Sequence, residues 1–273
     1  MTAGSEELIE AAEAHARELS ARWSRMQGGH VEDSGDMLVF VAGPKVPWTN
    51  GVRGARLAPA EAEARVLHAR ETFVRLGVPA TWYVSPLSRP ADLPSTLERA
   101  GVHHDADRPI RARSLADLPD AELPDGVTPH RVDGPVRHEQ WMEGSARGFG
   151  MDPVVAGAMR RLADVVGFAP DAPWQRFVAL DGDRPVGTSG LMVGAGVAGV
   201  YNVSTVPEAR RRGIGSAMTV HAMRHAAQAG LELVVLGAAA GAEGIYRRLG
   251  FRRICLVGEY VWDPFTGEGA EAT

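Results

Sequence analysis

The 273-residue sequence contains very little cysteine and lysine. Its one cysteine, Cys255, excludes an intramolecular disulfide and any metal site built from several cysteines. Cys255 lies in a strand-like run, where we expect a buried and inert thiol. The one lysine, Lys45, follows a proline, which excludes a phosphate loop of the Gly-Lys-Ser/Thr type.

Long apolar runs are also missing, since no stretch of about 20 apolar residues occurs. The first residues are acidic rather than signal-like, so we expect a soluble, cytoplasmic protein that does not bind membranes. A net charge of −5 and a pI of about 6.0 argue against nucleic-acid binding through phosphate neutralisation. A hydrophobic content of 45% is sufficient for one large or two ordinary packed domains.

The most informative stretch, residues 203–218, combines a strand, a turn and the start of a helix. β-branched residues favour a strand, and Pro207 should end it because proline cannot donate to a ladder. After Gly213, apolar residues recur at helical spacing as far as Ala229, and Gly230 is expected to end the helix.

Three consecutive arginines, Arg210 to Arg212, precede this helix. A cation at a helix N-terminus costs about 0.3–1 kcal/mol, whereas an anionic ligand there would reverse the sign. Gly213 and Gly215 would let the backbone approach such a ligand closely. A dinucleotide fingerprint is excluded because Met218 stands where its third glycine belongs. The stretch therefore predicts an anion site of another kind.

These residues resemble the acyl-coenzyme A site of the GNAT N-acetyltransferase superfamily. The family signature Arg/Gln-x-x-Gly-x-Gly/Ala stands here as Arg210-Arg211-Arg212-Gly213-Ile214-Gly215. The closing Tyr-x-x-x-Gly-Phe element stands as Tyr246-Arg247-Arg248-Leu249-Gly250-Phe251. The resemblance covers roughly Gly126 to Pro264, about half of the chain.

The resemblance implies an α/β fold in which a central mixed β-sheet is flanked by helices. Residues 126–264 would form the catalytic GNAT domain, and residues 115–125 the linker before it. Residues 1–120 repeat the order strand–helix–strand–helix–strand without an arginine–glycine loop. They are predicted to be a degenerate GNAT-like N-terminal domain, with an unrelated α/β extension as the alternative.

The resemblance also implies acetyl-CoA as cosubstrate and no metal. The loop amides would hold the pyrophosphate, and the preceding strand, which is bulged in the family, would pair with pantetheine. The amide of Thr205 or Val206 on this strand would donate to the thioester carbonyl. The expected coenzyme-binding residues are Ser204, Thr205, Val206, Arg210, Arg211, Arg212, Gly213, Ile214, Gly215 and Ser216. Many family members carry an asparagine or serine where this chain reads Gly237-Ala238-Ala239-Ala240-Gly241.

Tyr246 is the residue that the resemblance places opposite the coenzyme A sulfur, as the catalytic proton donor to the leaving thiolate. The group that deprotonates the amine is left open between a water relay and one of several side chains. These candidates are Tyr201, Asn202, Glu143, His138 and Glu259.

The predicted reaction is acetyl transfer from acetyl-CoA to a primary amine, either of a small molecule or of an amino acid derivative. A peptide or protein N-terminus is the alternative acceptor, and Trp141 could line a cleft for either one. A non-catalytic acyl-CoA-binding module is the alternative from another class. A homodimer is possible, and no nucleic acid or membrane partner is expected.

The residue patterns further predict individual elements along the chain. Helices are expected at 5–26, 59–76, 135–147, 153–166 and 242–249, with a further one opened by residues 88–94 and running to about residue 100. Strands are expected at 37–41, 52–57, 80–84, 109–114, 127–132, 231–236 and 252–262. Residues 175–180 and 185–192 should pair as a hairpin, followed by a turn at 194–199. Residues 27–36 are expected to be a turn-rich break, and residues 268–273 a frayed tail.

Overall fold

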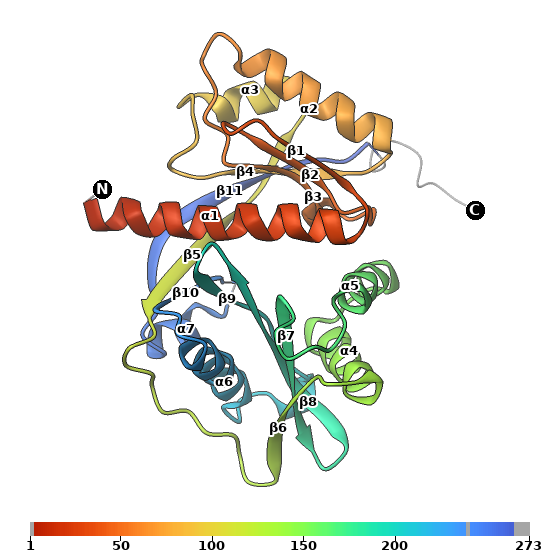
Figure 1. The fold of residues 1–273 in the computed structure, drawn as a ribbon, viewed down its shortest axis with the longest axis vertical. Coiled ribbons are helices and arrows are strands. Elements are labelled where there is room, and N and C mark those ends of the chain that lie inside the picture. Colours follow the sequence, from red (N-terminus) through yellow and green to blue (C-terminus); the bar gives the residue numbers. More distant parts are fainter. Residues whose placement is uncertain (1–2, 239–240, 265–273) are drawn as a thin grey trace. The chain divides into compact units, whose positions relative to one another are not determined.

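The computed structural model describes residues 3–238 and 241–264, and its elements are shown in Figure 1. The predicted tail at 268–273, and Ala239 and Ala240 of the segment after the 231–236 strand, lie outside the described residues. The elements of the first part of the chain are α1 (Ala3–Met26), β1 (His30–Asp33), β2 (Leu38–Val41), η1 (Pro47–Thr49), β3 (Asn50–Arg53), α2 (Ala62–Leu76), β4 (Ala80–Val84), α3 (Leu93–Arg99) and β5 (His103–Ser114).

The second part of the chain begins after β5. Its elements are β6 (Val127–Arg131), α4 (Pro135–Phe149), α5 (Pro153–Val166), β7 (Trp174–Asp181), β8 (Arg184–Gly194), β9 (Val197–Thr205), η2 (Pro207–Ala209), α6 (Ile214–Gln228), β10 (Leu233–Gly237), α7 (Glu243–Arg248) and β11 (Arg252–Trp262). The chain divides into two compact units, which are described separately. Unit 1 comprises Met1–Pro109 and the chain from Cys255 onward, and unit 2 comprises Ile110–Ile254.

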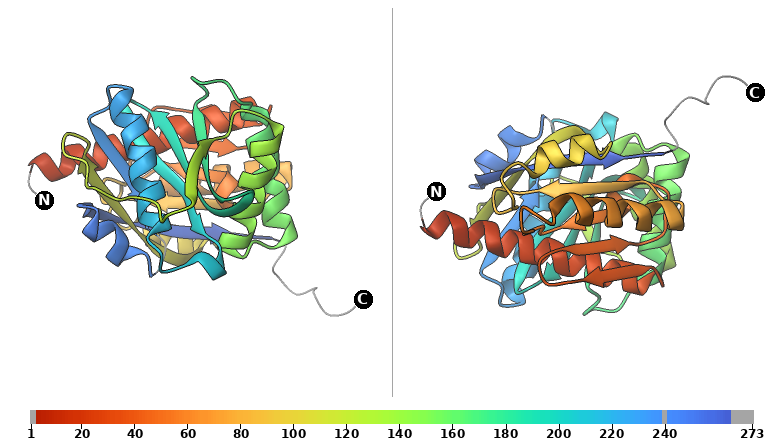
Figure 2. Two further views of the ribbon diagram at one scale, coloured as in Figure 1. Left: turned by 90° about the horizontal axis from the view of Figure 1, so that it is seen from below. Right: turned by 90° about the horizontal axis from the view of Figure 1, so that it is seen from above.

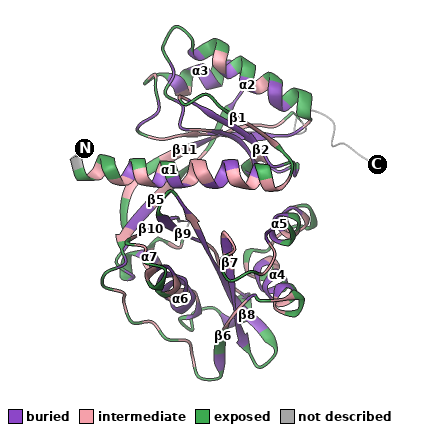
Figure 3. Cartoon of the chain, viewed as in Figure 1, coloured by how far each residue is buried: buried purple, intermediate pink, exposed green. Residues whose placement is uncertain are grey.

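Unit 2 contains a mixed sheet in the order β5-β10-β9-β8-β7-β6. The β10–β9 pair is parallel, and its neighbours on either side pair antiparallel. Helices α4 and α5 lie on one face of this sheet, and α6 and α7 lie on the other (Figures 1 and 2). The core on the α6 face is built from alternate strand residues such as Phe177 and Leu191, packed with Met218 and Met223 of α6. Figure 3 shows the strands between the helices as largely buried.

Unit 1 contains a sheet in the order β1-β2-β3-β4-β11, in which the β3–β4 pair is parallel. Alternation along β2 divides its side chains between two helical layers, because successive strand residues point to opposite faces. Leu38 and Phe40 pack with Ala21 of α1, whereas Val39 and Val41 pack with the core that includes Phe73 of α2. All four β2 residues are buried, so this strand is covered on both faces.

The last strand of each half of the sequence completes the sheet of the other half. β5 follows α3 in the chain, yet its residues from Ile110 to Ser114 pair antiparallel with β10 in unit 2. β11 follows α7, yet its residues from Gly258 to Trp262 pair antiparallel with β4 in unit 1. The predicted boundaries, 1–120 and 126–264, therefore differ from the two compact units in where they assign these strands.

Most predicted elements are confirmed within a few residues, and the differences have identifiable causes. The break predicted at 27–36 contains β1, a strand without a single buried residue and thus without apolar alternation. Strand β5 begins at His103 rather than near residue 109, because its first half is polar and exposed. The turn predicted at 194–199 is shorter than expected: it contains only Ala195 and Gly196, both with positive φ, because β8 and β9 are longer than expected.

Cys255 was expected to be buried and inert. It is a free thiol on β11 and is half-buried rather than fully buried. Burial is nevertheless sufficient to raise the pKa of the thiol to about 11. The thiol is therefore protonated at neutral pH, and the prediction of low reactivity is supported by this raised pKa.

Candidate functional site

Strand β9 carries a bulge near its carboxyl end. The register with β8 runs from Gly187 opposite Thr205 and Thr188 opposite Ser204 to Gly190 opposite Tyr201. Two residues of β9 thus oppose one residue of β8, the pattern of a β-bulge. One of the two, Asn202, has a φ of 51°, a left-handed conformation that costs a residue other than glycine about 1–3 kcal/mol.

Beyond the bulge, β9 has one paired edge and one edge that no residue within 3–238 and 241–264 pairs with. On the β8 side its pairing continues to Thr205, but its pairing with β10 consists of Ala198 and Gly199 alone. The Val206 amide donates to the Val186 carbonyl at 3.1 Å. Because amides alternate in direction along an antiparallel ladder, those of Val203 and Thr205 point to the unpaired edge. Of the two expected carbonyl donors, Thr205 has this orientation, whereas the Val206 amide is already engaged.

A short loop leads from this edge to the N-terminus of α6. Arg211 has a φ of 67°, and Gly213, the N-cap of α6, has a φ of 84°, which explains the need for glycine at the cap. The first amide of the helix to donate back is that of Ala217, which bonds the Gly213 carbonyl at 3.0 Å. The preceding amides, from Ile214 to Ser216, have no intrahelical acceptor and can bind an anion.

The three arginines of this loop have different surroundings. Arg210 donates to the Gly148 carbonyl at 3.1 Å and to the Thr205 carbonyl at 3.3 Å, so it braces the loop against α4 and β9. Arg212 lies 3.5 Å from the Asp181 carboxylate. Arg211 is exposed and makes neither an ion pair nor a hydrogen bond within residues 3–238 and 241–264. Arg211 is the arginine most available to a phosphate.

Helix α4 approaches β9 closely at Gly148. A Cβ atom there would lie 2.5 Å from the Ser204 hydroxyl oxygen and 3.3 Å from the Thr205 amide nitrogen. Neither separation is compatible with a larger side chain, so the close approach requires glycine. The Ser204 side chain consequently lies under α4 and is 6% exposed, and it does not face solvent.

Tyr246, the expected proton donor, lies on α7 in the same unit as β9 and α6. Its side chain is 9% exposed and belongs to the core on the α6 face, where its ring contacts Phe251 edge-on with centroids 5.9 Å apart. Burial raises the pKa of Tyr246 above the ordinary value of tyrosine. Its hydroxyl therefore keeps its proton at neutral pH, as a proton donor must.

Two of the candidate bases are engaged elsewhere. His138 is 4% exposed, with Nε2 at 2.9 Å from the Asp164 carboxylate and Nδ1 at 3.2 Å from the Arg176 guanidinium. Burial, followed by the charge of Arg176, lowers the pKa of His138. Glu259 belongs to unit 1 and is held by both arms of Arg108, with contacts of 2.5 and 2.7 Å. Both side chains are therefore already engaged by charged partners.

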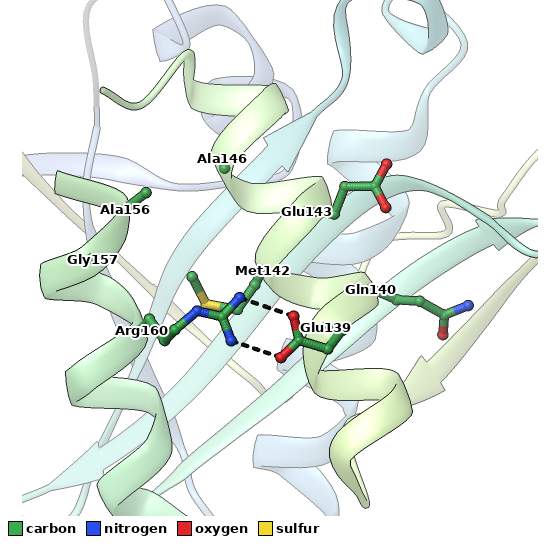
Figure 4. A pocket seen from close by; sticks show the side chains of 8 residues that line it. All are labelled: Glu139, Gln140, Met142, Glu143, Ala146, Ala156, Gly157 and Arg160. Carbon is green, nitrogen blue, oxygen red and sulfur yellow. Dashed lines mark hydrogen bonds and ion pairs between the residues drawn. The ribbon is translucent and has the colours of Figure 1, made fainter. Parts of the chain in front are cut away.

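The other three candidates lie on α4 and on β9 itself. Glu143 pairs with Arg147 at 3.1 Å and also lines a groove of about 370 Å³ between α4 and α5. Figure 4 shows the residues that line this groove, with an ion pair between Glu139 and Arg160 from α4 to α5 at 2.6 and 2.9 Å. Asn202 occupies the bulge itself, and Tyr201 precedes it in a half-buried position.

Sequence reasoning missed a buried arginine in this unit. Arg176 on β7 is 1% exposed and donates to the carbonyls of Ala163 and Gly167 near the end of α5. Its guanidinium lies over the rings of Trp141, Trp174 and Phe168. Burial lowers its pKa to about 10. A single arginine inside a strand pattern gives no sequence signal for such a role.

Trp141 was expected to line a cleft, and this expectation is wrong. Its side chain is fully buried, and its indole nitrogen donates to the Ser189 carbonyl at 3.2 Å, opposite the bulge. Thr188, which the sequence did not single out, also contacts the bulge and is fully buried. Alternating apolar residues in β8 predicted a strand, but not which of its polar residues face a neighbouring carbonyl.

Within residues 3–238 and 241–264, no three His, Cys, Asp or Glu side chains are arranged to hold a metal ion. None of the helices in the same part of the chain is both long and apolar enough to span a bilayer.

Comparisons with known proteins agree with this geometry. Residues 173–253 match the family described as an acetyltransferase (GNAT) domain. A mycothiol acetyltransferase of Arthrobacter sp. (strain FB24) is 34% identical over 152 residues, which cover 51% of this chain and 47% of the relative. A mycothiol acetyltransferase of Streptomyces bingchenggensis (strain BCW-1) is 31% identical over 150 residues, 53% of this chain and 49% of the relative. The chain thus matches about half the length of these curated relatives.

Solved structures extend the likeness to most of the chain. A GCN5-related N-acetyltransferase from Kribbella flavida superposes with a TM-score of 0.71 at 21% identity, covering 90% of this chain and 96% of the other. A tandem GNAT protein from the clavulanic acid biosynthesis pathway superposes with a TM-score of 0.58 at 14% identity, covering 83% of this chain and 77% of the other. At these identities the likeness establishes the fold, and the expected mixed α/β architecture is confirmed.

Proposed function

We propose that this chain, which matches the acetyltransferase (GNAT) domain family over residues 173–253, transfers the acetyl group of acetyl-CoA to a primary amine of a small molecule. The observation that carries the proposal is the unpaired edge of β9 after Gly199, which leads directly to the loop at the N-terminus of α6. An extended chain with amide groups can add to such an edge, and a pyrophosphate can bind at its end.

The phosphate end of the coenzyme would bind the loop between β9 and α6. The amides from Gly213 to Ser216 supply donors, and the helix dipole favours an anion at this position. Arg211 adds an exposed guanidinium, and Arg210 holds the loop in place through its bonds to Gly148 and Thr205. Guanidinium–phosphate hydrogen bonds are among the stronger polar contacts in proteins.

The thioester end would lie beside the bulge. The amides of Val203 and Thr205 point to the unpaired edge, where one of them can donate to the thioester carbonyl as negative charge develops on its oxygen. Attack of the neutral amine forms the new C–N bond and breaks the C–S bond, and the thiolate then takes a proton. Tyr246, which is buried and protonated, is proposed as the donor of that proton.

The proton released by the amine requires a separate acceptor. His138 and Glu259 are held by other side chains, which favours a relay through water over either of these residues. Glu143, Tyr201 and Asn202 stay candidates because they lie on α4 and β9. With a water relay, turnover should rise with pH until the acceptor amine is neutral.

A small-molecule acceptor is favoured over a peptide by the curated relatives. They are mycothiol acetyltransferases, and this chain matches about half of their length. The groove between α4 and α5 is polar, with Glu139, Gln140 and Glu143 along it, which suits a hydrophilic or cationic acceptor. A peptide or protein N-terminus is the alternative acceptor, and a non-catalytic acyl-CoA-binding module is the alternative function.

The test is release of free thiol from acetyl-CoA in the presence of a panel of acceptors. The panel contains the acceptor of mycothiol acetyltransferases, other primary amines, amino acids and short peptides. Turnover confined to small amines is the expected result, and turnover confined to peptides would replace the proposed acceptor class. Tight binding of acetyl-CoA without turnover of any acceptor would favour the non-catalytic module.

A further inference from the structure

The bulge in β9 leaves one backbone carbonyl of β9 without a ladder partner, and a neighbouring side chain takes its place. The Thr188 hydroxyl of β8 donates to the Asn202 carbonyl at 2.8 Å. The Ser189 carbonyl of β8, which lies opposite the bulge, accepts a hydrogen bond from the Trp141 indole of α4 at 3.2 Å. Both donor side chains are fully buried, so water does not compete for these bonds.

Two serine hydroxyls also contact the Thr188 hydroxyl. The Ser204 hydroxyl lies 2.7 Å from it and 3.2 Å from the Gly144 carbonyl, and Ser145 donates to Thr188 at 3.4 Å. Each hydroxyl has one proton and two lone pairs, so Ser204 can donate to Thr188 or to Gly144 but not to both. When the Thr188 proton lies on the Asn202 carbonyl, the short Ser204 contact requires the Ser204 proton to point to Thr188. In this arrangement Thr188 donates once and accepts from both serines.

The bond to Asn202 has a geometric consequence for the next residue. The Asn202 carbonyl and the Val203 amide belong to one planar peptide group, and in a trans peptide the C=O and N–H point in opposite directions. Holding the carbonyl toward β8 therefore turns the Val203 N–H toward the unpaired edge of β9. Asn202 itself has a left-handed φ of 51° at this point of the strand.

We propose that Thr188 is a positioning residue, whose hydroxyl orients the Val203 amide toward the thioester carbonyl by holding the Asn202 carbonyl. This inference rests on the proposed function. It assigns the carbonyl donor to Val203, one residue beyond the bulge, and gives a threonine of the neighbouring strand the task of aiming it. Thr188 itself touches neither substrate.

The test compares Thr188→Val, which removes the hydroxyl at similar size, with Thr188→Ser, which keeps it. Thr188→Val should lower kcat about 10- to 100-fold, as loss of one aligned carbonyl donor does, with little change in KM for acetyl-CoA. Thr188→Ser should return kcat to near the wild-type value. Thr49→Val is the matched control, because the buried Thr49 hydroxyl also bonds backbone carbonyls, at 2.9 and 2.8 Å, but in unit 1.

A binding measurement tests the role of Thr188 without any turnover. CoA lacks the thioester carbonyl, so the ratio of its Kd to that of acetyl-CoA reports on the carbonyl contact. Calorimetry should show that Thr188→Val reduces this ratio about 2- to 10-fold without changing the Kd for CoA. Thr188→Ala, which leaves room for water, serves if the valine variant does not fold.

Three results would overturn the proposal. They are full kcat in Thr188→Val, an equal loss of CoA and acetyl-CoA affinity, and a loss of kcat that Thr188→Ser does not restore. A wild-type protein that turns over no amine would contradict the proposed function instead. In that case the CoA to acetyl-CoA ratio still tests the role of Thr188.

Discussion

The two units contain the same run of elements, β3–α2–β4 in unit 1 and β9–α6–β10 in unit 2, with different outcomes. In each run a helix joins two parallel strands that pair over only two residues. In unit 2 the edge of β9 beyond that pairing is open. In unit 1 the chain after β4 returns to the corresponding place, where the Arg89 amide donates to the Ala55 carbonyl at 2.9 Å and the Leu57 amide to the Arg89 carbonyl at 3.1 Å.

The N-termini of the two helices, α6 and α2, also differ, and again the one in unit 2 is the more favourable for an anion. α6 begins after Arg210–Gly213 with a glycine cap, whereas α2 begins after Glu61 and has Glu63 in its first turn. Carboxylates there stabilise the helix but repel a phosphate. The comparison indicates that the order of elements alone does not make a coenzyme site. The proposed site depends on both an open strand edge and a cationic, glycine-capped helix start, and among the described residues these two features occur together in unit 2.

The largest effect is expected from separating the halves of the sequence. Removal of residues 1–125 deletes β5, the partner of β10, and β4, the partner of β11. Two bare strand edges then invite association, so we expect aggregation or loss of cooperative unfolding. Gel filtration and circular dichroism measure this. Addition of the 1–125 piece as a separate chain should restore a folded complex; a stable monomer without it would mean that unit 2 completes its sheet in another way.

Tyr246→Phe tests the chemistry of the open unit. Loss of a positioned proton donor lowers turnover about 100-fold or more, and the coenzyme should bind nearly as before because the ring is kept. Because burial raises the pKa of Tyr246, the alkaline fall in wild-type turnover should lie above the ordinary tyrosine value. Stopped-time thiol release across pH measures both effects. Equal turnover of the two proteins would show that Tyr246 serves packing against Phe251 only.

Charge reversal at the α6 loop tests the difference between the two helix starts. Arg211→Glu with Arg212→Glu should weaken acetyl-CoA binding about 10- to 100-fold, since guanidinium–phosphate bonds are replaced by repulsion. Arg252→Glu with Arg253→Glu, two adjacent exposed arginines of β11, is the control for net charge. Calorimetry should give one site per chain in the wild type. Unchanged affinity in the first variant, or a second site of similar strength, would remove the distinction drawn between the units.

The secondary-structure elements and the loop before α6 could be predicted from the sequence, because both depend on local patterns. Apolar periodicity, Pro207 and the arginine–glycine run predicted the strand, turn and helix of the site, and the structure contains them. The strand exchange was not predictable, since β5 and β11 read as ordinary strands and nothing local specifies their partners. The family resemblance implied a bulge in this strand, but its position was not predictable for a related reason: Asn202 is unremarkable in sequence, and the side chains that bond the two strands at the bulge, Thr188 and Trp141, are far along the chain.

The smallest effect concerns the free energy of unfolding at mildly acidic pH and the contributions of a histidine on α6 and a histidine on α2. His221 of α6 packs edge-on against Phe177 and beside His225, and burial lowers its pKa to about 4. The unfolded chain binds this proton near pH 6.5, so the contribution of His221 to stability is present above that pH and is lost as the pH falls toward 4.

Between pH 7 and pH 5, the free energy of unfolding should fall by about 1–2 kcal/mol less in His221→Leu than in the wild type. The expected difference is modest because the imidazole is only partly shielded from water. His68→Leu on α2 is the control, since its side chain is 55% exposed and lies 3.7 Å from Glu32. Urea unfolding at pH 7 and pH 5 measures both. An unchanged pH dependence in His221→Leu would mean that other groups, with His138 and His225 first among them, set the acid sensitivity of unit 2.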